Sequence, residues 1–236
     1  DGELCAAPGA DVWARIQDAA EAAYDRTDAC AFTSFIGWEW SGGPGTRNLH
    51  RNVIPRAPHA PAAPTSYFDR PTAEGLWDEL ARTCQPPCDV LTIPHNSNLS
   101  DGLMFPSLED FPGDPAIRAA WEPLVEVFQH KGSSECRPGD LGAEEACAFE
   151  RLPYNTLSGA NLGIRAEGQA LDFVRTVLGE GLRFGGANPY RYGLIASTDT
   201  HLGTPGLVAE AGYPGHGGAG HPNRTLADLR GLPDDP

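Results

Sequence analysis

The stretch Tyr192-Gly-Leu-Ile-Ala-Ser-Thr-Asp-Thr-His-Leu-Gly-Thr-Pro-Gly206 is an apolar run that stops abruptly at a carboxylate and an imidazole. Residues 193–196 predict a short buried strand, because the run is too short for a helix and is closed by turn-forming residues. Asp199 and His201 follow at the C-terminal end of this strand, the end that carries the chemistry in barrels and open α/β sheets. Asp-x-His suits zinc, manganese or iron. An Asp that caps a turn beside an ordinary His has the same pattern.

Four further predicted strands each carry a residue type that can ligate a metal. They cover residues 32–40, 48–54, 89–94 and 123–129, and the residues concerned are Glu39, His50, His95 and Glu126. A carboxylate in an apolar strand costs free energy unless it is paired or binds a cation, so Glu39 is either a rim residue or a site residue. His95 is either a ligand or a histidine hydrogen-bonded in a polar turn.

The repeated position of these residues favours a polynuclear metal centre of two or three divalent ions. Its predicted ligands are Glu39, His50, His95, Glu126, Asp199 and His201. Four polar residues stand beside the ligands and are predicted to bind substrate: Arg51, Asn96, His130 and Lys131. The cationic ones suit an anionic substrate group.

Helical periodicity marks the segments between the predicted strands. The expected helices cover residues 10–24, 72–84, 114–121 and 165–180. In the first, Val12, Ile16 and Ala20 share the face expected to be buried. Thr72 is a candidate N-cap of the second helix, and Gly181 a candidate stop for the last.

Composition bounds the class of protein. The chain has 236 residues, of which 40% are hydrophobic, enough for the core of one large domain or two small ones. Its formal net charge of -15 argues against a nucleic-acid binder, because phosphate-backbone binding needs clustered Lys and Arg. No apolar run reaches the roughly 18 residues that a membrane span requires.

Six cysteines fall into three sequence-local pairs. The pairing predicts the disulfides Cys5–Cys30, Cys84–Cys88 and Cys136–Cys147. A zinc site at Cys84 and Cys88 is the competing interpretation, although no second pair stands at finger-like spacing to complete it. Disulfides would place the protein in an oxidising compartment, either periplasmic or secreted.

The same segments carry a family resemblance. The chain resembles the domain of unknown function 3604 family, which is similar to the PHP (polymerase and histidinol phosphatase) metal-dependent hydrolases. The matching segments are residues 35–40, 48–54, 89–96, 124–132 and 197–201. The resemblance implies an α/β fold, a distorted seven-stranded (β/α) barrel with two or three divalent metals at the strand C-termini. It places Glu39, His95, Asp199 and His201 at ligand positions.

The chain also departs from the PHP pattern. It lacks the His-x-His of that superfamily's first strand, and five predicted strands are too few to close the barrel. We therefore expect residues 1–206 to form part of a barrel whose N-terminal strands lie upstream of Asp1, with that upstream polypeptide as a partner. Residues 207–236 are expected to be a Gly- and Pro-rich tail or the start of a following segment.

The expected function is that of a metal-dependent hydrolase, most simply a phosphoesterase acting on a small anionic ester. Glu39, Asp199 and His201 are the predicted catalytic residues, and a metal-bridging hydroxide the expected nucleophile. One alternative is hydrolysis of a carboxylic or carbamate ester. Another is an exported metal-binding or structural module without catalysis.

Overall fold

The computed structural model describes residues 3–56, 58–137, 139, 147 and 168–199. The helices are α1 (Glu3–Ala23), α2 (Ala73–Thr83), α3 (Pro115–Trp121) and α5 (Val174–Arg183). The strands are β1 (Trp38–Trp40), β2 (Arg51–Pro55), β3 (Val90–Pro94), β4 (Leu124–Gln129), β5 (Gly132–Ser133) and β6 (Gly193–Ala196). Short 3-10 turns cover Pro44–Thr46, Ser97–Leu99 and Ala170–Asp172.

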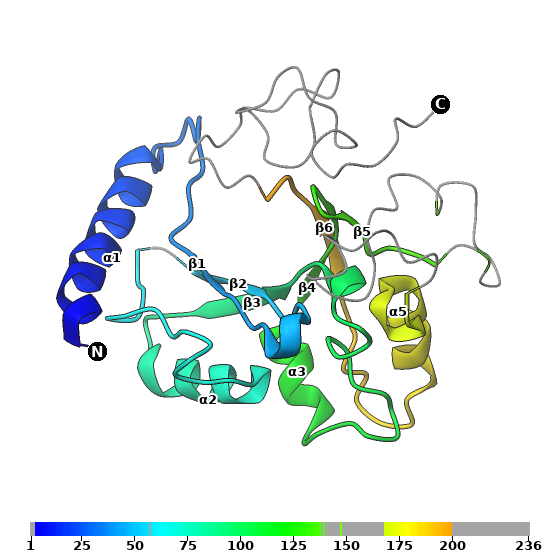
Figure 1. Ribbon diagram of the computed structural model, residues 1–236. Helices are drawn as coiled ribbons and strands as arrows, with labels where there is room; N and C mark the ends of the chain where they lie inside the picture. Colours follow the sequence, from blue (N-terminus) through cyan, green and yellow to red (C-terminus); the bar gives the residue numbers. More distant parts are fainter. Residues whose placement is uncertain (1–2, 57, 138, 140–146, 148–167, 200–236) are drawn as a thin grey trace, which may run out of the picture.

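The six described strands form two open sheets of three (Figure 1). The first has the order β1-β2-β3, with both pairs antiparallel. The second has the order β5-β4-β6, with β4 parallel to β6 and antiparallel to β5. β3 packs beside β4, which brings the two sheets together.

The predicted seven-stranded barrel is wrong, because the described residues form no closed barrel. A (β/α) barrel needs parallel strands joined by crossover helices, whereas β2 runs antiparallel to both of its neighbours. Only ten residues, 41–50, connect β1 to β2, and they contain no α-helix. That connection suits an antiparallel return.

Two hydrophobic clusters hold the helices to the sheets. In the first, side chains of β1 and β2 pack against α2: Trp40, Val53, Ala73, Leu76, Trp77 and Leu80. The second joins β4 to α5 and its flanking loops: Met104, Phe105, Val125, Val174, Val177 and Tyr190. The predicted N-cap of α2 is confirmed, since the Thr72 Oγ1 accepts the Gly75 N–H at 3.0 Å.

Helix α1 exists, but its predicted buried face is right only at Ala20. Val12 and Ile16 are exposed, while Trp13 and Ala20 are buried. The Trp13 indole sets the orientation: it packs edge-on against Trp38 at 5.4 Å and donates its N–H to the Pro61 carbonyl at 3.0 Å. One large aromatic side chain therefore outweighs a stripe of smaller apolar ones.

The strands predicted over residues 89–94, 123–129 and 193–196 are present as β3, β4 and β6, and the other two predictions shift. β6 is not the buried strand that was expected, because it is mostly exposed, with Leu194 53% exposed. The strand expected over residues 32–40 is reduced to β1, because the Asp25 N–H donates to the Phe32 carbonyl at 2.9 Å and closes residues 25–32 as a loop. The last predicted helix begins later, as α5. Gly181 lies inside α5 instead of ending it, since the helix continues to Arg183.

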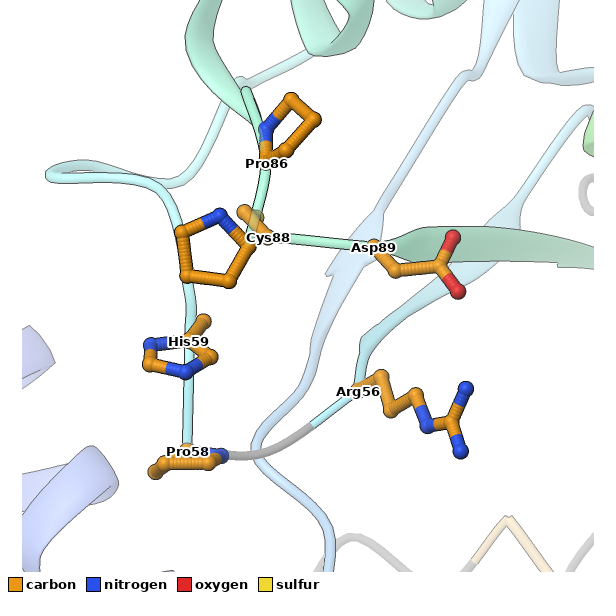
Figure 2. A pocket seen from close by; sticks show the side chains of 7 residues that line it. Arg56, Pro58, His59, Pro86, Cys88 and Asp89 are labelled. Carbon is orange, nitrogen blue, oxygen red and sulfur yellow. The ribbon is translucent and has the colours of Figure 1, made fainter.

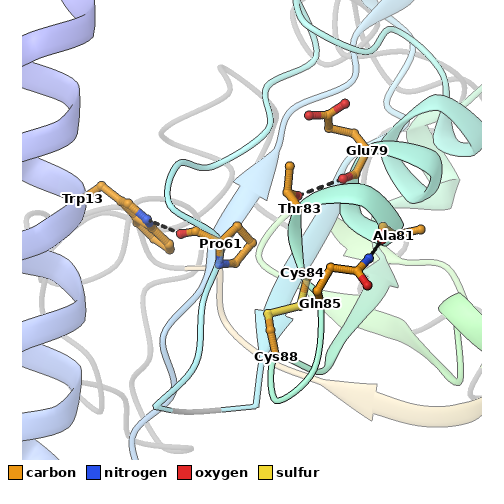
Figure 3. The surroundings of a disulfide bond; sticks show 8 residues. All are labelled: Trp13, Pro61, Glu79, Ala81, Thr83, Cys84, Gln85 and Cys88. Carbon is orange, nitrogen blue, oxygen red and sulfur yellow. Dashed lines mark hydrogen bonds between the residues drawn. A yellow bond between two sulfur atoms is a disulfide. The ribbon is translucent and has the colours of Figure 1, made fainter.

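Two of the three predicted disulfides are confirmed. Cys84–Cys88 ties the C-cap of α2 to the loop before β3 (Figure 3), and Cys136–Cys147 closes a longer loop. The Cys5–Cys30 bond is wrong, because Cys30 carries a free, exposed thiol. Cys5 lies in the first turns of α1, about 27 Å along the helix axis from its last residue. The closed loop after α1 keeps Cys30 at that opposite end.

None of the described helices is long and apolar enough to cross a membrane. The two disulfides fit an oxidising environment. The tail predicted over residues 207–236 lies outside the described residues.

Candidate metal centre

Antiparallel pairing explains why residues in or next to three strands meet at one end of the first sheet. Trp40 pairs with Arg51, and Arg51 with Pro94, so His50 and His95 stand opposite each other just beyond the paired residues. The His95 N–H donates to the His50 carbonyl at 3.3 Å. A residue that precedes β2 therefore lies at the same end of the sheet as one that follows β3.

Side-chain alternation then selects the face. Successive residues of a strand point to opposite sides, so Trp40 and Arg51 enter the core while Glu39 and His50 share the other face. His95 follows this alternation along β3. The sequence thus delivers one carboxylate and two imidazoles to one spot.

The geometry of the three side chains is compact. The Glu39 Oε1 lies 2.9 Å from the His50 Nδ1 and 2.9 Å from the His95 Nε2. One ligand atom from each residue lies within 4.8 Å of the others. The His95 side chain is 2% exposed and that of Glu39 is 30% exposed. The cluster is therefore buried at His95 and open to solvent at Glu39.

Hydrogen bonds keep Glu39 ionised. Partial burial opposes its charge, but the bonds from His50 and His95 outweigh this and hold the pKa of Glu39 well below its usual range. The Ser41 hydroxyl donates to the second carboxylate oxygen, Oε2. Ser41 therefore orients the carboxylate, as residues behind metal ligands commonly do.

The donor set fits a divalent transition metal. Zinc with ligands at about 2.0–2.1 Å places neighbouring ligand atoms roughly 3.3 Å apart, which the cluster can meet with small side-chain movements. Two nitrogens and one oxygen are a common catalytic zinc set that leaves a position open. The buried His95 Nδ1 has no hydrogen-bond partner among the described residues.

Asp199 lies in a second cluster, at the ends of β4 and β6. Its Oδ2 accepts from the Gln129 Nε2 at 2.6 Å and from the Lys131 ammonium, and lies 3.1 Å from the His130 Nε2. Burial opposes ionisation, yet His130 and Lys131 hold the pKa of Asp199 below its usual range. The predicted substrate-binding residues 130 and 131 thus lie against Asp199, and the Asn96 Oδ1 accepts from Gln129 at 2.5 Å.

Glu126 lies buried in β4 between these clusters. Its Oε2 accepts from the Ser197 hydroxyl at 2.5 Å, while its Oε1 has no hydrogen-bond partner among the described residues. Burial raises the pKa of Glu126. The nearby His95 opposes this shift, and the charge of Asp199 adds to it. Glu126 is not one of the three converging residues.

Arg51 does not reach the site. It is buried on the opposite face of β2, where its Nε donates to the Glu122 Oε1 at 2.8 Å and its Nη1 donates to the Leu49 carbonyl. Strand alternation is the reason, since neighbours of His50 must point away from it. Its predicted role in substrate binding therefore has no support in this arrangement. The predicted ligand His201 lies outside the described residues.

Sequence reasoning missed the residues that orient the candidate ligands. Ser41 supports Glu39, Ser197 supports Glu126, and Gln129 supports Asp199. The buried Asn48 accepts the His50 N–H through its Oδ1 at 2.9 Å. All four are small or amide side chains next to a strand end, a position that the search for charged ligands passed over.

A surface pocket lies at the other end of β2 and β3 (Figure 2). Its volume is about 550 Å³, and its lining includes Arg56, His59 and Asp89. His59 is exposed there, as its proline-rich surroundings predict. The pocket holds no three-residue ligand cluster among the described residues.

Fold and site together define an α/β protein with a cluster of two histidines and one carboxylate at one end of the first sheet. The chain belongs to the family described as protein of unknown function (DUF3604), whose model matches residues 2–231. No curated protein and no solved structure matched the chain.

Proposed function

We propose that this protein is a metal-dependent hydrolase of small anionic esters, most simply an exported phosphoesterase. The observation that carries the proposal is the convergence of Glu39, His50 and His95. A partly exposed carboxylate held ionised between two imidazoles is the arrangement expected of a metal site.

The chain's own residues would divide the work. Glu39, His50 and His95 hold the ion, and a divalent ion there would supply Lewis acidity and an activated water at neutral pH. Ser41 and Asn48 fix the orientation of the ligands. Glu126, with one oxygen unpartnered among the described residues and its pKa raised by burial, is suited to hold a proton beside the site.

The test is metal loading with matched variants. Chelator-treated protein is titrated with zinc and manganese, and bound metal and hydrolysis of p-nitrophenyl phosphate and p-nitrophenyl acetate are measured. We expect Glu39→Gln and His95→Ala to lower metal affinity at least about 100-fold and to remove hydrolysis. His59→Ala, a change at an exposed histidine in the loop beyond the far end of β2, should do neither.

The pattern of results separates the alternatives. Hydrolysis of the acetate but not the phosphate would favour a carboxylic ester hydrolase. Stoichiometric metal with turnover of neither ester would favour a metal-binding module without catalysis. Equal effects of His95→Ala and His59→Ala would show that the cluster is not a metal site.

A further inference from the structure

We infer that Gln129, His130 and Lys131 form an oxyanion-binding site whose internal occupant in this structure is the carboxylate of Asp199. The anion it would take is a tetrahedral oxyanion, a phosphate or sulfate group. As a substrate subsite this inference rests on the proposed function, but anion binding itself does not.

Three consecutive side chains converge on one oxygen atom. The Gln129 amide and the Lys131 ammonium donate to the Asp199 Oδ2, and the His130 Nε2 lies 3.1 Å from it. The His130 Nε2 also lies 3.0 Å from the Lys131 Nζ. His130 donates to Asp199 in its Nε2–H tautomer, and it accepts from Lys131 when Nε2 carries no proton. Proteins bind oxyanions with such sets of groups, here an amide, an imidazole and an ammonium that surround one oxygen atom.

The donors are held in place by contacts of their own. The Gln129 Oε1 accepts the Lys131 N–H at 2.7 Å, and its Nε2 also donates to the Asn96 Oδ1 at 2.5 Å. The amide of Gln129 is thus locked in one orientation. Asn96 is 1% exposed, and its Nδ2 has no hydrogen-bond partner among the described residues. A spare buried donor next to the converging ones is what an additional acceptor oxygen would satisfy.

The site is open where an anion would enter. The Lys131 and Asp199 side chains are 16% and 21% exposed, whereas that of His130 is 4% exposed. Lys131 is the single lysine of a chain with a net charge of -15.

Asp199 has the features of an occupant that can leave. It is a non-glycine residue at φ 51°, in the left-handed region that such residues seldom adopt. Its carboxylate supplies one charge to a site that a phosphate dianion would fill with more charge and more acceptor atoms. Competition between the two should set the affinity for free anions.

The experiment measures anion binding in chelator-treated full chain, so that the outcome does not depend on the metal centre. Inorganic phosphate, sulfate and acetate are titrated by calorimetry into the wild type, Asp199→Ala and Asp199→Ala/Lys131→Met. We expect Asp199→Ala to bind phosphate or sulfate at least about tenfold more tightly than the wild type, and the double variant to lose this gain. Asp110→Ala, at an exposed aspartate, is the matched control and should bind as the wild type does.

Two results would overturn the inference: an Asp199→Ala protein with unchanged anion affinity, or a gain that survives Lys131→Met. A gain for acetate alone would also contradict a tetrahedral oxyanion. If Asp199→Ala fails to fold, the rise in melting temperature that phosphate gives the wild type is compared with that of Lys131→Met. An equal rise in both would then reject the site. A chain that binds phosphate here but no metal at Glu39 would contradict the proposed hydrolase while leaving this inference intact.

Discussion

Glu39 and Glu122 make the same kind of contact in two regions of the molecule, with opposite consequences. Each carboxylate bridges two basic side chains from different elements. Glu39 contacts His50 and His95, while Glu122 accepts from the Arg51 Nε at 2.8 Å and from the Arg118 Nη1 at 2.7 Å. The Glu39 side chain is 30% exposed, and that of Glu122 is 0% exposed.

The bases account for the difference. A guanidinium stays protonated at any working pH, so it remains bound to Glu122 and offers no lone pair to a metal. An imidazole can give up its proton near neutrality and present a nitrogen to a cation. The buried arginine network therefore holds the sheet to α3, whereas the histidine cluster offers ring nitrogens to the proposed metal ion.

The largest effect expected from this comparison is the loss of stability in Glu122→Gln. The change leaves the buried Arg51 without its carboxylate partner and leaves Arg118 with only the more distant Glu74, 3.7 Å away. Breaking a buried pair in this way costs about 3–5 kcal/mol. The Tyr192 hydroxyl, which donates to the Glu122 Oε2 at 3.1 Å, also loses its charged acceptor. Urea unfolding at pH 7 measures the difference.

A surface ion pair provides the matched control for that change. Glu135 accepts from the Arg175 Nη2 at 2.6 Å, with both side chains more than 40% exposed. Glu135→Gln should cost less than about 1 kcal/mol, because exposed pairs contribute little. Similar losses in the two variants would show that the Glu122 network is not the structural element that its burial implies.

Acid sensitivity offers a finer comparison of the same two carboxylates. Histidine contacts lower the pKa of Glu39 against the effect of burial, and arginine charges do the same for Glu122. Because both folded-state pKa values lie below those of the unfolded chain, each contributes stability at pH values above about 4.3, and that contribution is lost as the pH falls. The free energy of unfolding of the chelator-treated protein should therefore fall with acidification.

Glu39→Gln should make this fall shallower while costing less stability at pH 7 than Glu122→Gln, since Glu39 is partly exposed. Urea unfolding from pH 7 to pH 3 measures both variants. A Glu39→Gln protein as acid-sensitive as the wild type would contradict the lowered pKa of Glu39.

Three of the six predicted ligands, Glu39, His50 and His95, lie together in the structure, whereas the predicted barrel is wrong. The pattern of an apolar strand followed by a polar residue marked Glu39, His50 and His95, because strand ends are local features that the chain states directly. Strand direction is not a local feature, and nothing in residues 48–55 shows that β2 runs antiparallel to its neighbours. The barrel was inferred from the family resemblance, and no local pattern could correct it. Alternation was available but unused for Arg51, whose position next to His50 requires the opposite face.

The burial of α1 was likewise decided by a distant partner. Trp13 is on the buried face because it packs against Trp38 and donates to the Pro61 carbonyl, both of which lie beyond the helix in sequence. Periodicity within residues 10–24 carries no record of those contacts. Local patterns therefore predicted which helices and strands exist, and long-range packing determined where they begin and which sides they bury.

The smallest effect on the metal centre is expected from the disulfide at the far end of the first sheet. Cys84–Cys88 precedes Asp89 and β3, whereas His95 follows that strand, so the length of β3 separates the bond from the ligands. Closing so short a loop stabilises by about 2 kcal/mol on chain-entropy grounds, against about 3 kcal/mol for the longer Cys136–Cys147 loop. The Cys84→Ser/Cys88→Ser protein should therefore unfold at lower urea concentration yet bind zinc within about twofold of the wild type. A large loss of zinc affinity in a variant that remains folded would mean that the two ends of the sheet are coupled, and that the cluster depends on the α2 attachment as well as on strand register.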